Sequence, residues 1–346
     1  MKKNILVTAV GGRSVGSGIL HALTRSSKEV SNRWNVVAAD ADTFAWGLYK
    51  VEKRMLLPFA NSPEYLGIIK DAIKKFNLDA IIPGSEAEAG ILSKNKHLFE
   101  IPVITNEHHL MPLMLDKFAA TNKIKELGLP TISTYKIEDW ETALTAFDFP
   151  IIVKPTTGTG GSKGVSLCTT MQELKTIINS LPEDSGYCIQ PLIGSDDEEY
   201  TVGVLSDKNG KLLDSIVMKR KLLGLSLLDT KKVGDVKFSI STGYSQGYFI
   251  KHKLIQDFCE NLSVAIESKG PLNIQLRIHK DKVYVFEIHP RFSGTTTMRA
   301  DVGFNEPDIL LRNYLYNEDF GRINYQFDVA VIRAFEHVVV PIDQML

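Results

Sequence analysis

The sequence lacks the features that mark secreted, membrane-spanning or nucleic-acid-binding proteins. Its 346 residues include only three cysteines, an odd number without metal-ligand spacing, which excludes a disulfide scaffold and favours a reduced cytoplasmic protein with buried thiols. The apolar run at residues 5–10 ends in two glycines, too early for a signal peptide, and no later run approaches the length of a membrane span. With 40 basic and 41 acidic side chains the formal net charge is -1, so we expect neither nucleic acid nor a membrane surface as a partner.

What is present indicates a globular chain of several packed units. Hydrophobic residues make up 44% and charged residues 23% of the sequence, which excludes a disordered or collagen-like protein. The chain exceeds the length at which one hydrophobic core keeps growing, so two or three units are expected. Residues 1–112 predict an α/β unit with a parallel sheet, because short apolar runs alternate with segments of helical spacing. The predicted strands are residues 4–10, 35–40, 53–57, 78–83 and 101–105.

The pattern changes after residue 112, and the rest of the chain predicts two α+β units. Residues 113–188 predict a small mixed unit, in which Asp116 caps one helix and Thr170 with Glu173 caps another. Residues 189–346 predict a third, mostly antiparallel unit. The elements that we expect from here to the end are strands at 187–193, 199–206, 212–220, 272–278, 282–289 and 328–335, with a helix at 250–268.

A glycine-rich turn at residues 11–18 follows the first predicted strand and precedes a helix, where backbone amides can bind an anion. Asp40 ends the second predicted strand, close to the place of a ribose-binding acid in a dinucleotide fold. A nicotinamide-dependent oxidoreductase built on residues 1–112 is therefore one hypothesis. The strict dinucleotide spacing of glycines is missing, however, and tight packing of a strand against a helix explains the same glycines at least as well.

Residues 151–155 predict a strand that carries Lys154 near its end, directly before a loop rich in glycine and hydroxyl groups at residues 156–165. Such a loop exposes backbone N–H groups that can surround a triphosphate, and a lysine on a strand supplies a fixed positive charge beside it. The order differs from a Walker loop, since the lysine precedes the glycines and a strand follows them. The alternative is a mobile surface hairpin with an exposed lysine.

Two successive strands of alternating polarity predict a metal-binding hairpin. Their apolar residues share one face if a three-residue loop at 280–282 joins them, and this register places Gln275 opposite Glu287 and Asn273 opposite His289. Directly opposed Cβ atoms lie about 4.5–5.5 Å apart, so the polar tips of such a pair can share one ion. An amide oxygen and a carboxylate suit a hard divalent cation. The alternative is a solvated face of the sheet.

The loop after this hairpin, residues 290–299, contains two arginines, one glycine and several hydroxyl side chains. Arg291 and Arg299 can receive a transferred phosphoryl group or a substrate carboxylate. An arginine shortly after a carboxylate ligand is typical of phosphoryl transfer. The alternative is an ordinary loop whose arginines form salt bridges.

Taken in order along the chain, these motifs resemble those of the ATP-grasp superfamily. The sequence is most similar to one synthetase unit of the carbamoyl phosphate synthetase large chain, as a free-standing unit, and to related carboxylate–amine ligases. The resemblance implies an ATP-grasp fold with a Rossmann-like domain at 1–112, a lid subdomain at 113–188 and a C-terminal subdomain at 189–346. The motifs that carry it are Asp116-Lys117, Val153-Lys154-Pro155, the loop from Gly158 to Gly164, Gln190-Pro191-Leu192-Ile193-Gly194, Glu199-Tyr200-Thr201-Val202, Asn273-Ile274-Gln275 and Glu287-Ile288-His289-Pro290-Arg291.

The resemblance also implies which residues bind ATP. Lys117 and Lys154 would contact the phosphates, and Glu199 would bind the ribose hydroxyl groups. The loop residues that would close over the phosphates are Gly158, Gly160, Gly161, Ser162 and Gly164, and adenine would be held by Gln190, Pro191 and Leu192.

The implied metal site shows one departure from the family pattern. Gln275, Glu287 and His289 would bind one or two Mg²⁺ ions, but the family usually has asparagine at the position of His289. An imidazole nitrogen suits Mn²⁺ better than Mg²⁺. Either the metal preference is shifted, or His289 has another role, such as a hydrogen bond to Asn273 across the hairpin.

The expected activity is ATP-dependent ligation of a small carboxylic acid to an amine through an acyl phosphate, with release of ADP and phosphate. Arg291 would steady the transferred phosphoryl group, and Arg220 and Arg299, together with Lys219, are candidates for binding the substrate carboxylate. A homodimer is a possible assembly. The competing hypotheses are the nicotinamide-dependent oxidoreductase and a protein that senses ATP without turnover.

Overall fold

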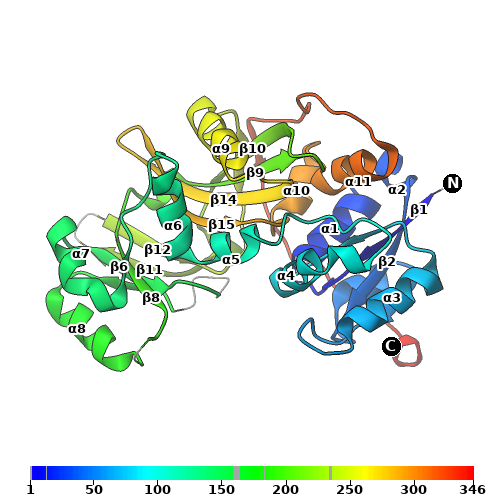
Figure 1. Cartoon of the computed structure of the whole chain (residues 1–346), viewed down its shortest axis with the longest axis horizontal. Coiled ribbons are helices and arrows are strands. Elements are labelled where there is room, and N and C mark those ends of the chain that lie inside the picture. Colours follow the sequence, from blue (N-terminus) through cyan, green and yellow to red (C-terminus); the bar gives the residue numbers. More distant parts are fainter. Residues whose placement is uncertain (1, 13, 159–163, 183, 234–235) are drawn as a thin grey trace.

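The structure has three parts that lie side by side along the molecule. The computed structural model describes residues 2–12, 14–158, 164–182, 184–233 and 236–346. Figure 1 shows an N-terminal α/β part at one end, a long antiparallel sheet in the middle, and a smaller part with helices α7 and α8 at the other end. The predicted fold class, α/β followed by α+β, is confirmed.

The N-terminal sheet is parallel, as predicted, with strand order β3-β2-β1-β4. The predicted fifth strand at 101–105 is wrong: Val103 forms only an isolated bridge with Ile81. The backbone does not continue as a strand, because Pro102 has no N–H to donate and Thr105 turns back to bond the carbonyl of Val103 at 3.1 Å. The elements of this part are β1 (Lys3–Val7), α1 (Val15–Thr24), α2 (Lys28–Ser31), β2 (Trp34–Asp40), β3 (Lys53–Leu56), α3 (Tyr65–Phe76), β4 (Ala80–Ile82) and α4 (Glu86–Lys94).

The glycines between β1 and α1 serve close backbone packing. A Cβ atom on Gly16 would lie 2.2 Å from the carbonyl oxygen of Thr8, and one on Gly84 would lie 1.9 Å from the same oxygen. The N–H of Gly16 donates to the carbonyl of Gly84 at 3.0 Å. Only glycine allows strands β1 and β4 to approach the start of α1 this closely.

The lid is a four-stranded sheet with order β5-β8-β6-β7, covered by helices α7 and α8. Both predicted caps are present: the Asp116 side chain accepts from the N–H of Ala119 at 2.8 Å, and that of Thr170 accepts from the N–H of Glu173 at 3.3 Å. The elements are α5 (Leu110–Leu115), α6 (Lys117–Glu126), β5 (Tyr135–Lys136), α7 (Trp140–Ala146), β6 (Ile151–Pro155), β7 (Ser166–Cys168), α8 (Met171–Ser180) and β8 (Tyr187–Pro191). The expected boundaries at residues 112 and 188 thus lie inside α5 and β8.

The central sheet is antiparallel throughout, with order β15-β14-β9-β10-β13-β16. A two-stranded hairpin, β11 (Leu227–Val233) with β12 (Val236–Ser241), extends from it toward the lid, and no sequence prediction covers this hairpin. Helix α9 (Lys253–Ala265) packs on one face of the sheet. The strands are β9 (Glu199–Ser206), β10 (Leu212–Arg220), β13 (Gly247–Ile250), β14 (Gly270–His279), β15 (Lys282–His289) and β16 (Val329–Val331).

The β14–β15 register confirms both predicted pairs, Gln275 with Glu287 and Asn273 with His289. The expected three-residue loop is wrong. Lys280 and Asp281, with φ of 48° and 57°, form a two-residue turn, which places the intervening pairs one residue out of the expected register. A bulge at Phe286 restores the pairing at Glu287.

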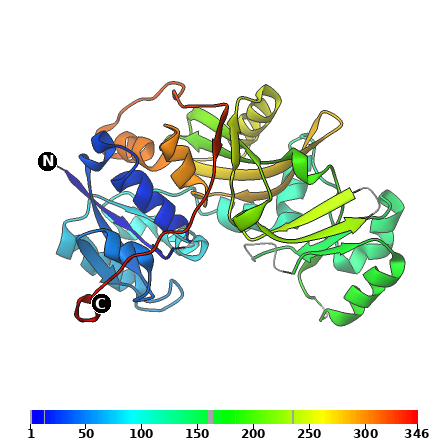
Figure 2. The ribbon, with the colours of Figure 1, turned by 180° about the vertical axis from the view of Figure 1, so that it is seen from behind.

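The C-terminal part of the chain returns to the N-terminal domain. Helices α10 (Thr296–Asp301) and α11 (Glu306–Tyr316) pack against α1, and their apolar residues share one core with the parallel sheet. The last residues then run across the N-terminal part, as Figure 2 shows in red, where Glu336 forms an ion pair with Arg25 at 3.0 Å. The three cysteines are buried, as expected, and no disulfide joins them. Among the described residues, no helix has the length and apolarity required to cross a membrane.

Candidate active site

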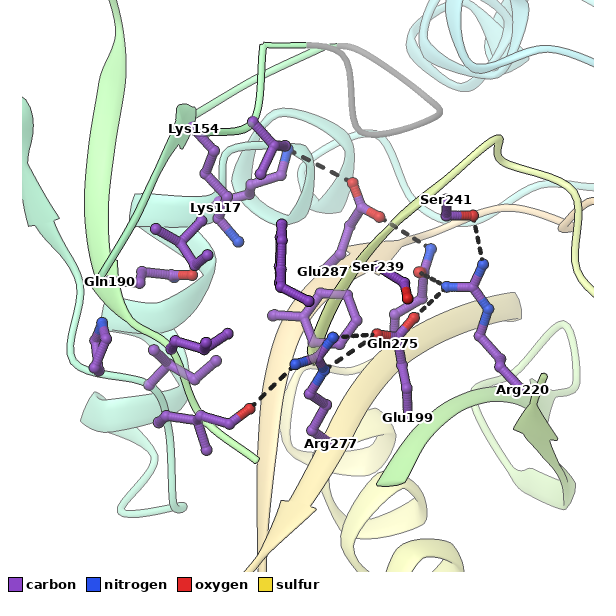
Figure 3. A pocket seen from close by; sticks show the side chains of 18 of the residues that line it. Lys117, Lys154, Gln190, Glu199, Arg220, Ser239, Ser241, Gln275, Arg277 and Glu287 are labelled. Carbon is purple, nitrogen blue, oxygen red and sulfur yellow. Dashed lines mark hydrogen bonds and ion pairs between the residues drawn. The ribbon is translucent and has the colours of Figure 1, made fainter. Parts of the chain in front are cut away.

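A cavity of about 190 Å³ lies between the lid and the central sheet (Figure 3). The lid contributes Lys154 from β6 and the segment at 190–193, which continues from the end of β8. The sheet contributes polar side chains from β9, β10, β14 and β15, and the hairpin β11–β12 closes one side. Most of the predicted nucleotide-binding residues therefore meet in one place. Those that line the cavity are Lys117, Lys154, Gln190, Pro191, Leu192, Glu199, Gln275 and Glu287, together with Arg220.

Lys154 is a buried cation at the end of a lid strand. Its ammonium lies 5.8 Å from the centre of the Phe286 ring, and among the described residues it forms no ion pair. Burial lowers the pKa of Lys154 to about 8, and the charge of Lys117 acts in the same direction. A buried lysine without a neutralising partner suits a ligand that brings negative charge.

Lys117 and Glu287 connect the first turn of α6 to β15. Lys117 follows the capping residue Asp116, its backbone N–H donates to the carbonyl of Thr156 at 2.7 Å, and its ammonium lies 3.5 Å from Glu287. Gln275 donates to the other carboxylate oxygen of Glu287 at 2.9 Å. Burial alone would raise the pKa of Glu287, but His289 and the two lysines outweigh it and hold this pKa well below its usual range. Glu287 is therefore ionised at neutral pH.

Glu199 forms a buried network with two arginines. It accepts hydrogen bonds from Arg220 and from the Nε and Nη2 atoms of Arg277, the latter at 3.1 and 2.8 Å. Arg220 also donates to Ser241 at 2.8 Å, and its Nε atom is buried without a partner among the described residues. The Oγ atom of Ser239, on the cavity wall, is also buried without a hydrogen-bond partner among the described residues. These unused groups fit a polar ligand such as a nucleotide.

Sequence reasoning missed Arg277, Ser239 and Ser241. Arg277 lies two residues after Gln275 on β14 and thus on the same face of the strand, which is a signal that the alternating pattern contains. The two serines lie on β12, whose residues 236–241 alternate between apolar and polar side chains, a strand signal that the sequence predictions did not use.

The residues that were predicted to bind adenine form some of their hydrogen bonds with other residues of the lid. The Gln190 side chain donates to the hydroxyl of Thr134 at 2.8 Å, and the N–H of Leu192 donates to the carbonyl of Pro150 at 3.0 Å. In the glycine loop, Gly158 and Gly164 are described, with φ of 63° and 77°. Gly160, Gly161 and Ser162 lie outside the described residues.

A second cavity, of about 360 Å³, adjoins the first and reaches the N-terminal domain. The two cavities share Lys117, Gly243, Ser245, Gln275 and Glu287 as walls. The second cavity is also lined by Ser14, Glu86, Asn273, His289, Arg291 and Arg333. Lys117, Gln275 and Glu287, which are predicted to bind phosphate or metal, therefore lie between the two cavities.

His289 lies between two carboxylates in the second cavity. Its Nδ1 atom is 2.9 Å from Glu86 on α4, and its Nε2 atom is 3.3 Å from Glu287. Arg291 also bonds Glu86, at 3.2 Å. Burial would raise the pKa of Glu86, but His289 and Arg291 lower it to about 2. The expected alternative bond from His289 to Asn273 is not formed, because the Asn273 oxygen accepts from Thr201 and Arg299 instead.

The structure separates the other candidate residues for the substrate carboxylate. Arg291 lines the second cavity, whereas Arg220 lines the first. Arg299 is 1% exposed, is paired with the buried Glu306 at 2.9 Å, and lines neither cavity. Its expected contact with substrate is therefore corrected to a structural ion pair. Lys219 bonds Glu198 at 2.8 Å and also lies outside both cavities.

The N-terminal turn gives no support to a dinucleotide site. Asp40 accepts a hydrogen bond from the N–H of Gly11 at 2.8 Å and lines neither cavity. Close packing requires Gly16 and Gly84, as described above. The packing interpretation of the glycines is thus favoured over the nicotinamide hypothesis.

Three family models match consecutive parts of the chain, each less than half of it. Residues 5–104 match the PylC-like N-terminal domain, residues 116–221 match the carbamoyl-phosphate synthase L chain ATP binding domain, and residues 195–335 match a model described as ATP-grasp in the biosynthetic pathway with Ter operon.

Solved structures with the same fold include three enzymes of low sequence identity. The N5-carboxyaminoimidazole ribonucleotide synthetase from Thermotoga maritima has a TM-score of 0.63 at 17% identity, covering 93% of this chain and 78% of that one. The biotin carboxylase from Campylobacter jejuni has a TM-score of 0.66 at 18% identity, with coverages of 94% and 74%. The L-amino acid ligase from Bacillus licheniformis has a TM-score of 0.62 at 17% identity, with coverages of 91% and 74%.

These comparisons confirm the resemblance to the ATP-grasp superfamily and the ATP-grasp fold. Two of the matching models describe an ATP-grasp domain and an ATP binding domain, which supports the expected ATP-dependent ligase, and one neighbour of the same fold was solved with MgADP. The described residues include no group of three or more His, Cys, Asp or Glu side chains that could hold a metal alone. The ionised Glu287 on the wall of the first cavity nevertheless fits a hard cation that arrives with ATP, although the Gln275 oxygen accepts from Arg220 at 3.3 Å and its NH₂ group faces Glu287.

Proposed function

We propose that the protein is a carboxylate–amine ligase that forms an amide through an acyl phosphate and releases ADP and phosphate. The observation that carries this proposal is the shared wall of Lys117, Gln275 and Glu287 between the two cavities. An ATP γ-phosphate bound from the first cavity would face a carboxylate bound in the second. A carboxylate oxygen then attacks the γ-phosphorus, ADP leaves, and an amine later displaces phosphate from the acyl carbon and loses a proton.

ATP binding is assigned to the first cavity. Lys154 and Lys117 provide fixed positive charges for the phosphates. The loop that includes Gly158 and Gly164 is assigned to cover the phosphates, and its residue Gly158 lines the adjoining second cavity. The segment from Gln190 to Leu192 holds adenine. Glu199 binds the ribose hydroxyl groups, and Arg220 and Arg277 keep its carboxylate in place.

Metal binding is assigned to Gln275, Glu287 and His289. When bound, the cation would neutralise negative charge on the phosphoryl oxygens. The contact of His289 Nδ1 with Glu86 supports this role, because metal-binding histidines usually donate their other ring N–H to a carboxylate. That donation leaves Nε2 as the free nitrogen on the side of Glu287.

Arg291 is assigned to the acyl phosphate. Its guanidinium is held by Glu86 and by the carbonyl of Phe292 at 2.8 Å, so its position is fixed before substrate binds. Phosphoryl transfer moves negative charge toward the second cavity, where a fixed cation stabilises it.

The substrates are a small carboxylic acid and an amine that meet in the second cavity. One of the solved structures with the same fold is that of an L-amino acid ligase. We further propose that the chain divides into domains at 1–112, 113–188 and 189–346. We also propose a cytoplasmic location, which agrees with three buried cysteines that form no disulfide, and a homodimeric assembly.

The experiment that tests this proposal is ADP release from the full chain with ATP and Mg²⁺ or Mn²⁺ across a matrix of carboxylic acids and amines. The proposal expects ADP formation that requires both an acid and an amine, with an amide as product. ATP binding without turnover in the whole matrix would instead favour an ATP sensor.

A further inference from the structure

The second cavity contains one arginine whose charge no neighbour balances. Its charged lining residues are Glu86, Lys117, Glu287, His289, Arg291 and Arg333. Glu86 pairs with Arg291 and His289, and Lys117 pairs with Glu287. Among the residues that the structure describes, no carboxylate pairs with Arg333. The cavity therefore has an unused guanidinium on the wall that the C-terminal segment supplies.

Arg333 is held in place by neutral groups. It follows β16, which pairs with β13, and its backbone N–H donates to the side chain of Gln246 at 3.4 Å. Its Nη2 atom donates to the carbonyl of Gly294 at 2.6 Å, and its guanidinium lies 5.3 Å from the centre of the Tyr244 ring. These contacts fix the guanidinium plane without neutralising it, and they leave other N–H donors of the fork for a ligand.

Arg333 borders open space. Both Arg333 and its partner Gly294 line the second cavity, which has a volume of about 360 Å³. Burial lowers the pKa of Arg333, as expected for a cation partly withdrawn from water, but an arginine keeps its charge in a protein. A partly buried cation that faces an open cavity favours an anionic ligand.

We propose that Arg333 is a specificity-determining residue that binds a substrate carboxylate which the reaction does not consume. This inference rests on the proposed ligase function, in which Arg291 and Glu287 act on the carboxylate that reacts with ATP and Arg333 is left for a second carboxylate. A planar guanidinium binds a carboxylate through two parallel N–H···O bonds and rejects a carboxamide, which offers only one acceptor oxygen. The substrate class is therefore an amino acid that acts as the amine, or a dicarboxylic acid that acts as the acid.

The test begins with binding, because binding does not require turnover. The full chain saturated with ADP and Mg²⁺ is titrated calorimetrically with L-amino acids and their carboxamides, and with succinate, glutarate and adipate and their monoamides. At least one carboxylate is expected to bind at least about 10-fold more tightly than its amide. The two sets of probes distinguish an amino acid from a dicarboxylic acid.

Variants then assign the effect to Arg333. R333Q is expected to weaken binding of the preferred carboxylate by about 10–100-fold and to leave its amide unchanged, while R333K retains part of the affinity. R25Q is the matched control, because it removes an ion pair of the same C-terminal segment, with Glu336, but no charge from the cavity. Thermal unfolding verifies that each variant is folded.

Two results would overturn the assignment: no carboxylate probe that binds better than its amide, or a preference that R333Q leaves intact. Glu287-dependent ADP release with an acid and an amine is measured separately. If that release occurs while Arg333 has no effect, the ligase proposal stands and the Arg333 assignment fails. If Arg333 binds a carboxylate but no ADP forms, the ligase proposal fails instead.

Discussion

The ammonium of Lys117, on the first turn of α6, lies 3.5 Å from the carboxylate of Glu287, near the end of β15. The pair lies on the wall shared by the two cavities, so it marks the point where the proposed nucleotide and substrate spaces meet.

Glu287→Gln is expected to reduce turnover by at least about 100-fold with little change in fold, because it removes the carboxylate that we assign to the cation and not a residue of the apolar core. ADP release and far-UV circular dichroism measure the two effects. Glu198→Gln is a matched control, since Glu198 ends the short turn directly before β9 and lies outside both cavities. Wild-type product formation by the Glu287 variant would contradict the metal assignment.

Lys154→Ala is expected to raise the KM for ATP and slow turnover, because it removes a preorganised charge. The effect should exceed that of Lys163→Ala, at a position outside the described residues, and that of Lys175→Ala, on the lid near Trp140. Equal effects of all three changes would show that Lys154 is not the fixed charge.

The pKa of Lys154 also predicts a pH dependence of ATP binding. The protonated form attracts phosphate, and its pKa in the free protein is lowered to about 8, so the affinity for ATP should decrease as the pH rises through this value. Lys154→Arg keeps its charge at that pH and should flatten the profile. Titrations of the two proteins between pH 7 and 9 test this; an identical decrease in both would assign the effect to another group.

His289→Asn is expected to shift the metal preference from Mn²⁺ toward Mg²⁺ while keeping activity, because an amide oxygen replaces an imidazole nitrogen. The ratio of ADP release rates with the two metals is the measurement. Glu86→Gln, which removes the Nδ1 partner of His289, should alter the same ratio. An unchanged ratio in both variants would mean that His289 does not ligate the cation.

Glu199→Gln is expected to lower the free energy of unfolding by about 3–5 kcal/mol, because two buried arginines lose their carboxylate. Burial raises the pKa of Glu199, but Arg220 and Arg277 lower it below its ordinary value. The stabilisation from this network is therefore present at neutral pH and lost as the pH falls below that value. Urea unfolding measures it, and the exposed Glu198–Lys219 pair should contribute at most about 1 kcal/mol.

The sequence predicted three long strands of the central sheet most accurately. The bounds of β9, β10 and β15 agree with the predicted ranges 199–206, 212–220 and 282–289. The polarity of β15 alternates, as in a half-buried strand, whereas β9 and β10 are buried on both faces and are marked by their runs of apolar residues. The hairpin turn was less predictable, since a two-residue turn shifts the intervening pairs by one residue and a bulge at Phe286 restores the pairing at Glu287.

Contacts between distant segments were not predictable from one sequence. Glu86 and His289 are separated by 203 residues and meet because α10 and α11 dock the C-terminal part on the N-terminal domain. The position of Arg299 in the sequence suggested that it binds substrate. In the structure, Arg299 is buried and forms an ion pair with Glu306 on the next helix. Arg333 enters the cavity only because the C-terminal segment returns to the central sheet.

The most direct test of the central claim follows one oxygen atom. The acid substrate found in the ADP-release matrix is labelled with oxygen-18 in its carboxylate, and the phosphate released during ligation is analysed by mass spectrometry. An acyl phosphate transfers a carboxylate oxygen to phosphorus, so each phosphate released with product should carry one labelled oxygen. Unlabelled phosphate, or release of AMP and pyrophosphate, would contradict the account.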